Sequence, residues 1–286
     1  ARPAMSEQRP VTQFWNTFGR RLVPFADVAS AELPLSRLLR LSLFQVSVGM
    51  TMVLLTGTLN RVMIVELGVA AWLVALMAAL PMLAAPFRAL LGFRSDTHRS
   101  AIGWKRTPYL WFGSLTQFGG LAIMPFALIV LSGDQTTGPS WAGPAGAALA
   151  FLMAGAGVHM TQTAGLALAT DIAPEDKRPR VVALLYVSLL AGMGVSAGLF
   201  GWLLMDFSQL TLIQVIQGSA VAVLALNLVA LWRQEHVRPM SREERAAARP
   251  PFREAWADLM AGGRAGRLLA AVVLGTLAFS MQDILL

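Results

Sequence analysis

The sequence GFRSDTHRSAIGWKR, residues 92–106, is a short polar segment between two long apolar runs. Residues 67–87 before it and residues 107–133 after it contain no Asp, Glu, Lys or Arg. Basic residues in the segment outnumber its single acidic residue, Asp96. Short loops with an excess of Lys and Arg remain on the cytoplasmic side of a membrane. We therefore interpret residues 92–106 as a cytoplasmic loop, which sets the direction of every other segment.

The composition indicates a polytopic membrane protein. Of the 286 residues, 56% are hydrophobic and only 14% are charged, whereas a soluble domain carries about 25% charged residues. The chain contains no cysteine, which excludes disulfides and thiolate metal sites. The net charge is +7, but the basic residues fall in alternate connections. This pattern is typical of membrane topology and contact with anionic lipid, and we expect no nucleic-acid binding.

Seven apolar runs have about the 20 residues that a membrane-spanning helix needs, and they predict an all-α polytopic fold. Their ranges are 39–62, 68–91, 107–131, 144–169, 180–204, 210–232 and 267–286. The charge of the connections places the N-terminus and three connections in the cytoplasm, namely 92–106, 171–180 and 233–267. The predicted organisation is an interfacial cytoplasmic arm at 1–36, a six-helix half at 37–232, an amphipathic linker at 233–266 and the start of a second half at 267–286.

Three ionisable residues are predicted near membrane depth, where such residues usually face the protein interior and have a partner. Arg61 lies at the outer end of the first span and Glu66 follows closely, so we predict an ion pair between them. A simple interfacial anchor is the alternative for Arg61. Asp283 in the seventh run is the best candidate for a functional carboxylate. Small residues in the fourth and fifth spans, such as Gly155 and Gly194, predict close helix contacts within the protein.

Two cytoplasmic connections stand in equivalent places, after the second and the fourth span. Their notable residues are Gly92, Asp96, Arg99, Lys105 and Arg106 in the first, and Asp171 and Arg178 in the second. Together the connections resemble the signature loops of the major facilitator superfamily, although the first has an insertion between Arg99 and Gly103. The resemblance implies a major-facilitator-like bundle in which a carboxylate at a helix end pairs with nearby bases and can separate when the halves rock. Each connection alone could also be an ordinary basic loop.

A closer resemblance is carried by four segments. They are LNRVMIVELGV (59–69), APFRALLGFRSDTHRSAIGWKRTPYLWFG (85–113), QFGGLAIMPFAL (117–128) and MQDILL (281–286). The segments resemble the PucC/LhaA light-harvesting assembly family, the bacteriochlorophyll-delivery branch of the same superfamily. The resemblance covers most of residues 35–286 and is most specific at 85–113. It implies about twelve spans, so residues 267–286 would be the first span of a longer second half.

The resemblance also implies a function. The protein would be an assembly factor that binds bacteriochlorophyll a and delivers it to light-harvesting antenna polypeptides, with a carotenoid as a further pigment. Its implied partners are these polypeptides, the reaction-centre core complex, enzymes of bacteriochlorophyll synthesis and membrane lipids. Its implied location is the inner, photosynthetic intracytoplasmic membrane of a bacterium.

His159 is the histidine placed in the middle of a predicted span, and an imidazole can ligate the magnesium of a chlorin. Gly155 lies one helical turn earlier on the same face, where a small residue would leave room for a flat macrocycle. Asn60 and Gln162 are further pigment candidates. The alternative is that the histidine and the amides bond between helices while the small residues serve packing.

Two other functions compete with the assembly factor. A secondary transporter of a small solute is what a facilitator-like fold alone favours, and a membrane enzyme of pigment synthesis is the third reading. Fold does not decide function, and the resemblance at 85–113 favours the assembly factor. The sequence contains no P-loop, HExxH or GxGxxG motif, so we expect no enzyme activity.

Overall fold

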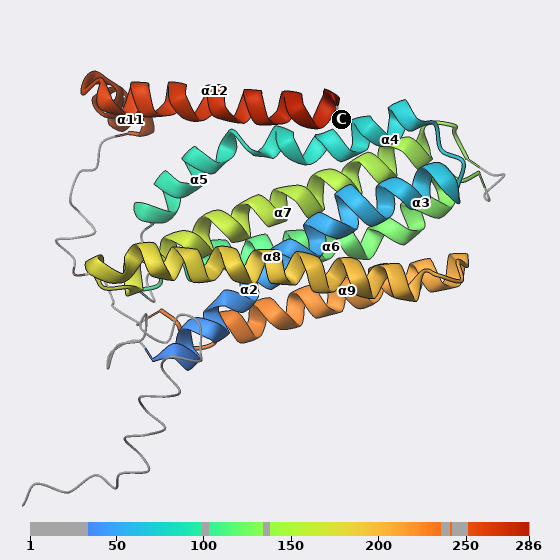
Figure 1. Ribbon diagram of the computed structural model, residues 1–286, viewed down its shortest axis with the longest axis horizontal. Helices are drawn as coiled ribbons and strands as arrows, with labels where there is room; N and C mark the ends of the chain where they lie inside the picture. The colour runs from blue at the N-terminus through green and yellow to red at the C-terminus, as the bar shows by residue number, and fades with distance from the viewer. Residues whose placement is uncertain (1–33, 99–102, 134–137, 236–240, 242–250, 286) are drawn as a thin grey trace, which may run out of the picture. The chain divides into compact units, whose positions relative to one another are not determined.

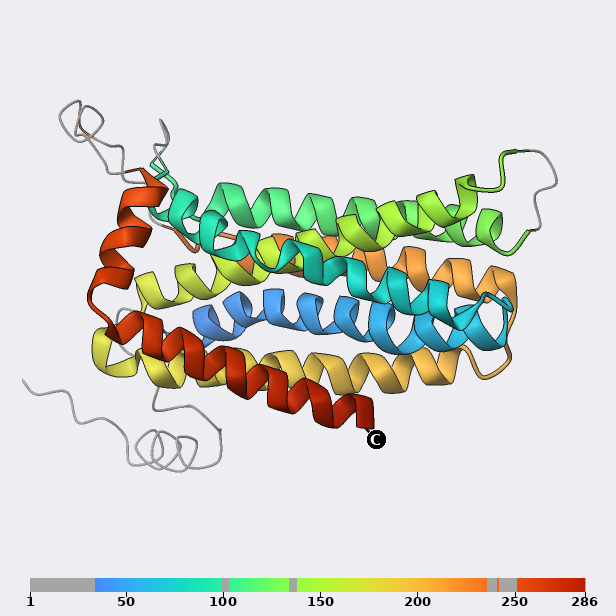
Figure 2. The same cartoon turned by 90° about the horizontal axis from the view of Figure 1, so that it is seen from above.

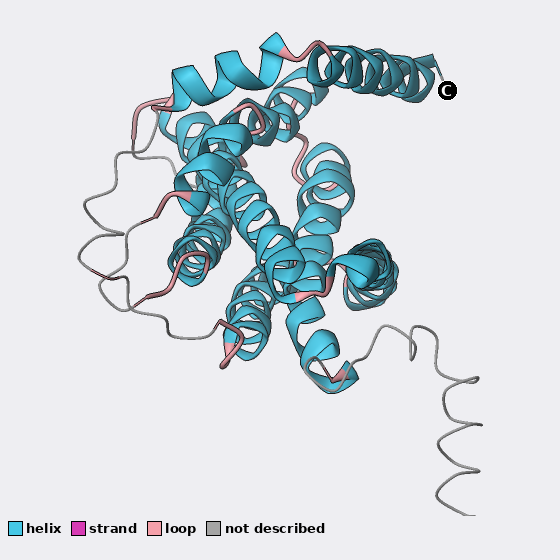
Figure 3. Ribbon diagram, turned by 90° about the vertical axis from the view of Figure 1, so that its left-hand side faces the viewer, coloured by secondary structure: helices cyan, strands magenta, loops and turns pink. Residues whose placement is uncertain are grey.

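The computed structural model describes residues 34–98, 103–133, 138–235, 241 and 251–285. Within these residues the chain is helical and forms no strand (Figure 3), which confirms the all-α prediction. The chain divides into two compact units, one ending at Pro239 and the other beginning at Met240. Each unit is described by itself below.

The first unit contains long helices that run side by side along one direction (Figures 1 and 2). Its elements are α2 (Leu35–Val53), the π-helical turn η2 (Leu54–Thr58), α3 (Leu59–Val65), α4 (Ala71–Ala79), the 3₁₀ segment η3 (Leu80–Ala84), α5 (Phe87–Asp96), α6 (Thr107–Leu131), α7 (Ala142–Ile172), η4 (Glu175–Lys177), α8 (Arg178–Leu203) and α9 (Gln209–Leu231).

Six helical segments among the described residues are long and apolar enough to cross a membrane, and the protein is a multi-pass membrane protein. They are Leu35–Val65, Ala71–Asp96, Thr107–Leu131, Ala142–Ile172, Glu175–Leu203 and Gln209–Leu231. Each coincides with one of the first six predicted runs to within a few residues.

Local sequence explains several helix ends. Pro108 stands in the first turn of α6, where its missing N–H removes no helical hydrogen bond. Gly133 follows α6 with a φ of 82°, a left-handed conformation that glycine adopts without steric cost. Ser208 caps α9, because its Oγ accepts a hydrogen bond from the backbone N–H of Thr211 over 3.0 Å.

The second span is broken into α4, η3 and α5. Pro81 lies in η3 and Pro86 immediately precedes α5, and a proline inside a helix removes a hydrogen bond and clashes with the preceding turn. Helix α5 then continues to Asp96. The prediction that residues 92–106 are all loop was therefore wrong for 92–96, because α5 continues through Gly92 to Asp96 before the chain leaves the helix at Thr97.

Glycines bring α6 and α7 close together. A Cβ built on Gly120 would meet the backbone of Ala154, and one built on Gly157 would meet the backbone of Gln117. These contacts agree with the small-residue packing predicted for the fourth span. The same prediction was wrong for Gly194 in α8, since a Cβ built there meets nothing within 4 Å.

The second unit contains α11 (Phe252–Ala261) and α12 (Arg264–Leu285). Helix α11 lies within the amphipathic linker predicted at 233–266, and its Phe252 and Trp256 rings lie 5.9 Å apart, one turn from each other. Helix α12 coincides with the seventh predicted run, but it is not among the six described helices that meet the length and hydropathy criteria for a span.

Candidate functional site

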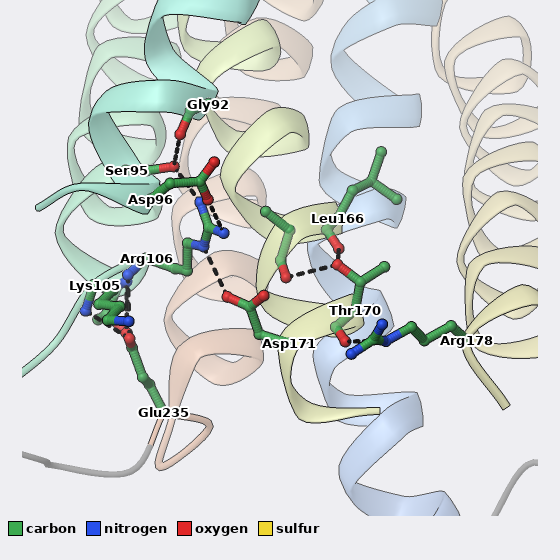
Figure 4. Close-up of polar contacts among 12 residues, drawn as sticks. Gly92, Ser95, Asp96, Lys105, Arg106, Leu166, Thr170, Asp171, Arg178 and Glu235 are labelled. Carbon is green, nitrogen blue, oxygen red and sulfur yellow. Dashed lines mark hydrogen bonds and ion pairs between the residues drawn. The ribbon is translucent and has the colours of Figure 1, made fainter. Parts of the chain in front are cut away.

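A charged cluster joins the ends of α5, α6 and α7, with Arg106 at its centre. The Arg106 side chain is almost fully buried, with 8% of its surface exposed. Its Nε donates to Asp171 Oδ2 over 2.9 Å, its Nη1 donates to Ser95 Oγ over 2.5 Å, and its Nη2 forms an ion pair with Asp96. Figure 4 shows the guanidinium between carboxylates from two different helices.

Helix dipoles explain why a buried cation belongs there. Asp96 is the last residue of α5, and Asp171 lies in the last turn of α7. The C-terminal end of a helix carries partial negative charge, so a carboxylate is unfavourable at that position. The Arg106 guanidinium compensates both carboxylates and both helix ends at once.

Glu235, which follows α9, caps the beginning of α6. Its Oε1 accepts the backbone N–H of Lys105 over 2.6 Å, and its Oε2 accepts the backbone N–H and the hydroxyl of Thr107 over 2.9 and 2.8 Å. A carboxylate at a helix N-terminus satisfies otherwise unpaired N–H groups and favours the helix dipole. We call Ser95, Asp96, Arg106, Asp171 and Glu235 the Arg106 cluster.

The pKa of Arg106 reflects this environment. Burial by itself lowers the pKa of the guanidinium, but the hydrogen bond and charge of Asp171, together with Asp96, outweigh burial and raise the pKa above its ordinary value. Arg106 therefore stays charged at physiological pH.

Sequence reasoning identified Asp96, Arg106 and Asp171 and missed Glu235. Glu235 falls within the amphipathic linker predicted at 233–266, and the sequence signal for it is an acidic residue just after the sixth span. Its partners are about 130 residues away in sequence, so no local pattern could pair them.

The other residues of the two predicted signature loops lie elsewhere. Gly92 is inside α5 rather than in a loop, and its carbonyl accepts a hydrogen bond from Ser95 Oγ. Lys105 meets Glu235 through its backbone N–H. Arg178 belongs to a separate contact, with Glu175 at 3.4 Å and the Thr170 carbonyl at 3.1 Å. Arg99 lies outside the described residues.

The predicted intramembrane charges have different surroundings. Arg61 Nη2 lies 3.8 Å from Glu66 Oε1, but 67% of the Arg61 side chain is exposed. An exposed pair at that distance contributes little stability, and Arg61 does not face the interior of the first unit. Asp283 lies in α12, and its side chain is outside the described residues.

The space predicted beside His159 is filled by protein. A Cβ built on Gly155 would overlap the ring of Pro81 from η3. The His159 Nδ1 is buried without a hydrogen-bond partner. The expectation of a flat gap for a macrocycle at Gly155 is therefore wrong, because the break in the second span inserts a proline there.

Other amides of the first unit form hydrogen bonds between helices. Gln117 of α6 donates to Thr51 Oγ1 over 2.6 Å, and Ser47 donates to Asn227 Oδ1 over 2.6 Å. Gln162 is buried in α7, and Asn60 is half-buried in α3.

A groove of about 590 Å³ lies where α6 begins and α9 ends. Apolar and aromatic side chains form most of its surface, and Glu235 of the Arg106 cluster is part of its wall. Among the lining residues are Trp104, Trp111, Phe112, Leu228, Leu231 and Trp232. Its volume is in the range of small-molecule sites, about 300–1,000 Å³.

Known proteins resemble this chain over most of its described length. The sequence model of the family described as PUCC protein matches residues 58–286. An uncharacterized protein in the puhA-bchM intergenic region of Rhodobacter capsulatus is 68% identical over 264 residues, covering 92% of this chain and 55% of that protein. Protein PucC of Rhodovulum sulfidophilum is 59% identical over 275 residues, covering 94% of this chain and 60% of that protein.

A more distant relative is the bacteriochlorophyll synthase 44.5 kDa chain of Rhodobacter capsulatus, which is 28% identical over 78% of this chain and 50% of its own length. The chain thus spans little more than half the length of these relatives. No solved structure matches it. The extent of the family match and the high identity to these relatives show that this chain belongs to the PUCC protein family.

Proposed function

We propose that this protein is a pigment-handling assembly factor that binds bacteriochlorophyll and delivers it to light-harvesting antenna polypeptides. Membership of the PUCC family supports the proposal, and so does the relative whose name refers to bacteriochlorophyll synthesis. The structural observation that carries it is the aromatic groove between α6 and α9. In this role the protein is a carrier and has no catalytic activity of its own.

The groove residues fit a flat apolar ring better than the His159 position does. Indole and phenyl rings offer faces on which a conjugated macrocycle can stack, and three tryptophans and Phe112 line the groove. The lining supplies stacking rather than metal ligation. Both Glu235 oxygens already accept hydrogen bonds, and the Gln234 amide bonds with Arg37.

Bound pigment would contribute its magnesium and its conjugated ring, while the protein would orient it and shield it from water. Glu235 links the groove wall to the Arg106 cluster. Groove occupancy and the arrangement of the helix ends are coupled by that residue, which offers a route for release when the ends separate.

The proposed location, partners and pigments are those that membership of the PUCC family suggests. The protein acts in the inner, photosynthetic intracytoplasmic membrane with its N-terminus and the Arg106 cluster on the cytoplasmic side. Its partners are antenna polypeptides, the reaction-centre core complex, enzymes of bacteriochlorophyll synthesis and membrane lipids. Bacteriochlorophyll a is the proposed pigment, with a carotenoid as a second one. A major-facilitator-like arrangement of two halves is part of the same proposal.

The test is the pigment-to-protein ratio of protein purified gently from a bacteriochlorophyll-producing host. Near-infrared absorbance should accompany the wild type, and Trp111→Ala should lower the ratio by about half or more, because stacked aromatic contacts of about 0.5–1.5 kcal/mol are lost. Trp202→Ala is the matched control, since Trp202 is exposed near the end of α8 and is not part of the groove wall.

A colourless wild type that takes up a small solute with protons would instead establish the secondary transporter. If the wild type is coloured and Trp111→Ala has an unchanged pigment-to-protein ratio, the pigment binds to another surface of the protein.

A further inference from the structure

A cation lies inside the second span, away from the Arg106 cluster. Arg88 is in the first turn of α5, eight residues before Asp96. At a rise of 1.5 Å per residue this places Arg88 roughly 12 Å inside the end of the helix. The residue is half-buried, and neither the Arg106 cluster nor the aromatic groove uses it.

Residues of two neighbouring helices lie near the Arg88 guanidinium. Arg88 Nε donates to Thr163 Oγ1 of α7 over 3.0 Å, and the Thr163 hydroxyl donates to the His159 carbonyl over 2.7 Å. Because the Thr163 hydroxyl donates its hydrogen to that carbonyl, the Thr163 Oγ1 can only accept a hydrogen bond from Arg88. Tyr186 of α8 is close enough to interact electrostatically with the guanidinium.

Within the described residues, Arg88 forms no ion pair with a carboxylate. Ion pairs among the described residues include those of Arg61, Arg106 and Arg178. A charged group at membrane depth is costly, faces the protein interior or a cavity, and marks a functional site by default. One neutral hydroxyl uses one of the five guanidinium donors and compensates no charge.

The residues around Arg88 are accessible at the surface of the first unit. Tyr186 is 45% exposed, and Arg88 is itself partly exposed. Thr163 fixes the plane of the guanidinium from behind through its bond to Nε, which leaves the two terminal nitrogens for a ligand. A planar fork of this kind matches a carboxylate or phosphate with two parallel hydrogen bonds.

We propose that Arg88, Thr163 and Tyr186 form an anion site at membrane depth that takes the carboxylate or phosphate of an amphipathic, membrane-dissolved ligand. Arg88 binds the anion, Thr163 orients the guanidinium, and the Tyr186 hydroxyl is a further donor. Where the ligand is a tetrapyrrole, this rests on the proposed function, and the anion site takes the free acid, whose propionate is charged, while the aromatic groove takes the neutral ester.

The test uses the protein in nanodiscs of phosphatidylcholine and two probes, bacteriochlorophyllide, which has a free carboxylate, and bacteriochlorophyll, its ester. Quenching of tryptophan fluorescence gives both affinities. Arg88→Gln should weaken binding of the free acid about ten- to hundredfold, the loss expected for a hydrogen bond to a charged group, and leave binding of the ester unchanged. Arg88→Lys should recover most of the affinity because it keeps the charge.

Arg94→Gln is the matched control, because Arg94 is an exposed residue of the same helix. Thr163→Val keeps the cation and removes the oxygen that orients it, so it should weaken free-acid binding about three- to tenfold. If Arg88→Gln does not insert into the membrane, Thr163→Val alone tests the anion site.

A third arm identifies the source of the anion. Nanodiscs that contain phosphatidylglycerol should compete with the free acid in the wild type and not in Arg88→Gln if the natural ligand is a lipid headgroup. Equal affinity of wild type, Arg88→Gln and Thr163→Val for both the free acid and phosphatidylglycerol would overturn the anion site.

The outcomes also separate this inference from the proposed function. Binding of the ester without any effect of Arg88 would retain the assembly factor and remove the anion site. Arg88-dependent binding of phosphatidylglycerol without any tetrapyrrole binding would retain the anion site and remove the assembly factor.

Discussion

The second span contacts α7 at two places, and the two contacts use different forces. At the helix ends, Asp96 and Asp171 share the Arg106 guanidinium. Further along α7, Gly155 has no side chain and Pro81 packs directly against its backbone. The first contact is electrostatic and includes half-exposed carboxylates, whereas the second is steric and buried.

The difference shows what each contact tolerates. A charged cluster depends on the kind of side chain, and water can partly replace a lost partner where the carboxylates are exposed. A close-packed contact depends on volume, and packed interiors respond even to one added methylene group. Substitutions at the two places should therefore separate the two forces.

Gly155→Leu should have the largest effect. The added side chain would overlap the rigid Pro81 ring, and overpacking at such a contact costs about 3 kcal/mol. The expected result is a clearly lower thermal midpoint of the purified protein, followed by its tryptophan fluorescence. Gly194→Leu in α8 is the control, because a Cβ there meets nothing within 4 Å. Equal midpoints for the two variants would show that Pro81 yields easily.

Arg106→Ala should have the next largest effect. Breaking a fully buried ion pair costs about 3–5 kcal/mol, and we expect about 2 kcal/mol here because solvent reaches both aspartates. The double variant Asp96→Asn, Asp171→Asn in the Arg106→Ala background should recover part of the loss, since it removes the uncompensated carboxylates. A triple variant no more stable than Arg106→Ala would contradict the electrostatic account. Thermal midpoints provide the comparison.

Glu235→Gln should have the smallest effect of the three. The amide keeps one acceptor oxygen for the N–H groups of α6 but loses the negative charge at the helix N-terminus, which contributes about 0.3–1 kcal/mol. Hydrogen–deuterium exchange at residues 105–107 should become faster while exchange in the middle of α6 stays the same. Exchange that rises uniformly along α6 would mean that Glu235 supports packing of the whole helix rather than its cap.

The sequence predicted most residues of the charged contact around Arg106, but it did not predict the packed contact between Pro81 and Gly155. Asp96, Arg106 and Asp171 could be identified because residue type and position relative to two apolar runs suffice for a helix-end charge. His159 and Gly155 were also correctly placed on one face of the fourth span. The occupant of the space beside them could not be predicted, because it depends on how the second span bends at Pro81 and on its register against α7.

The sequence by itself determined the class of the protein, its first six spans and the location of its charged connections. Hydrophobic length and charge are local properties, and the absence of water in a bilayer forces each long apolar run to be helical. The tertiary structure alone decided that Pro81 fills the space at Gly155, that Glu235 caps α6 and that Arg88 meets Thr163. These contacts join residues about 75 to 130 positions apart, and such pairs arise from the register of packed helices, which no local pattern encodes.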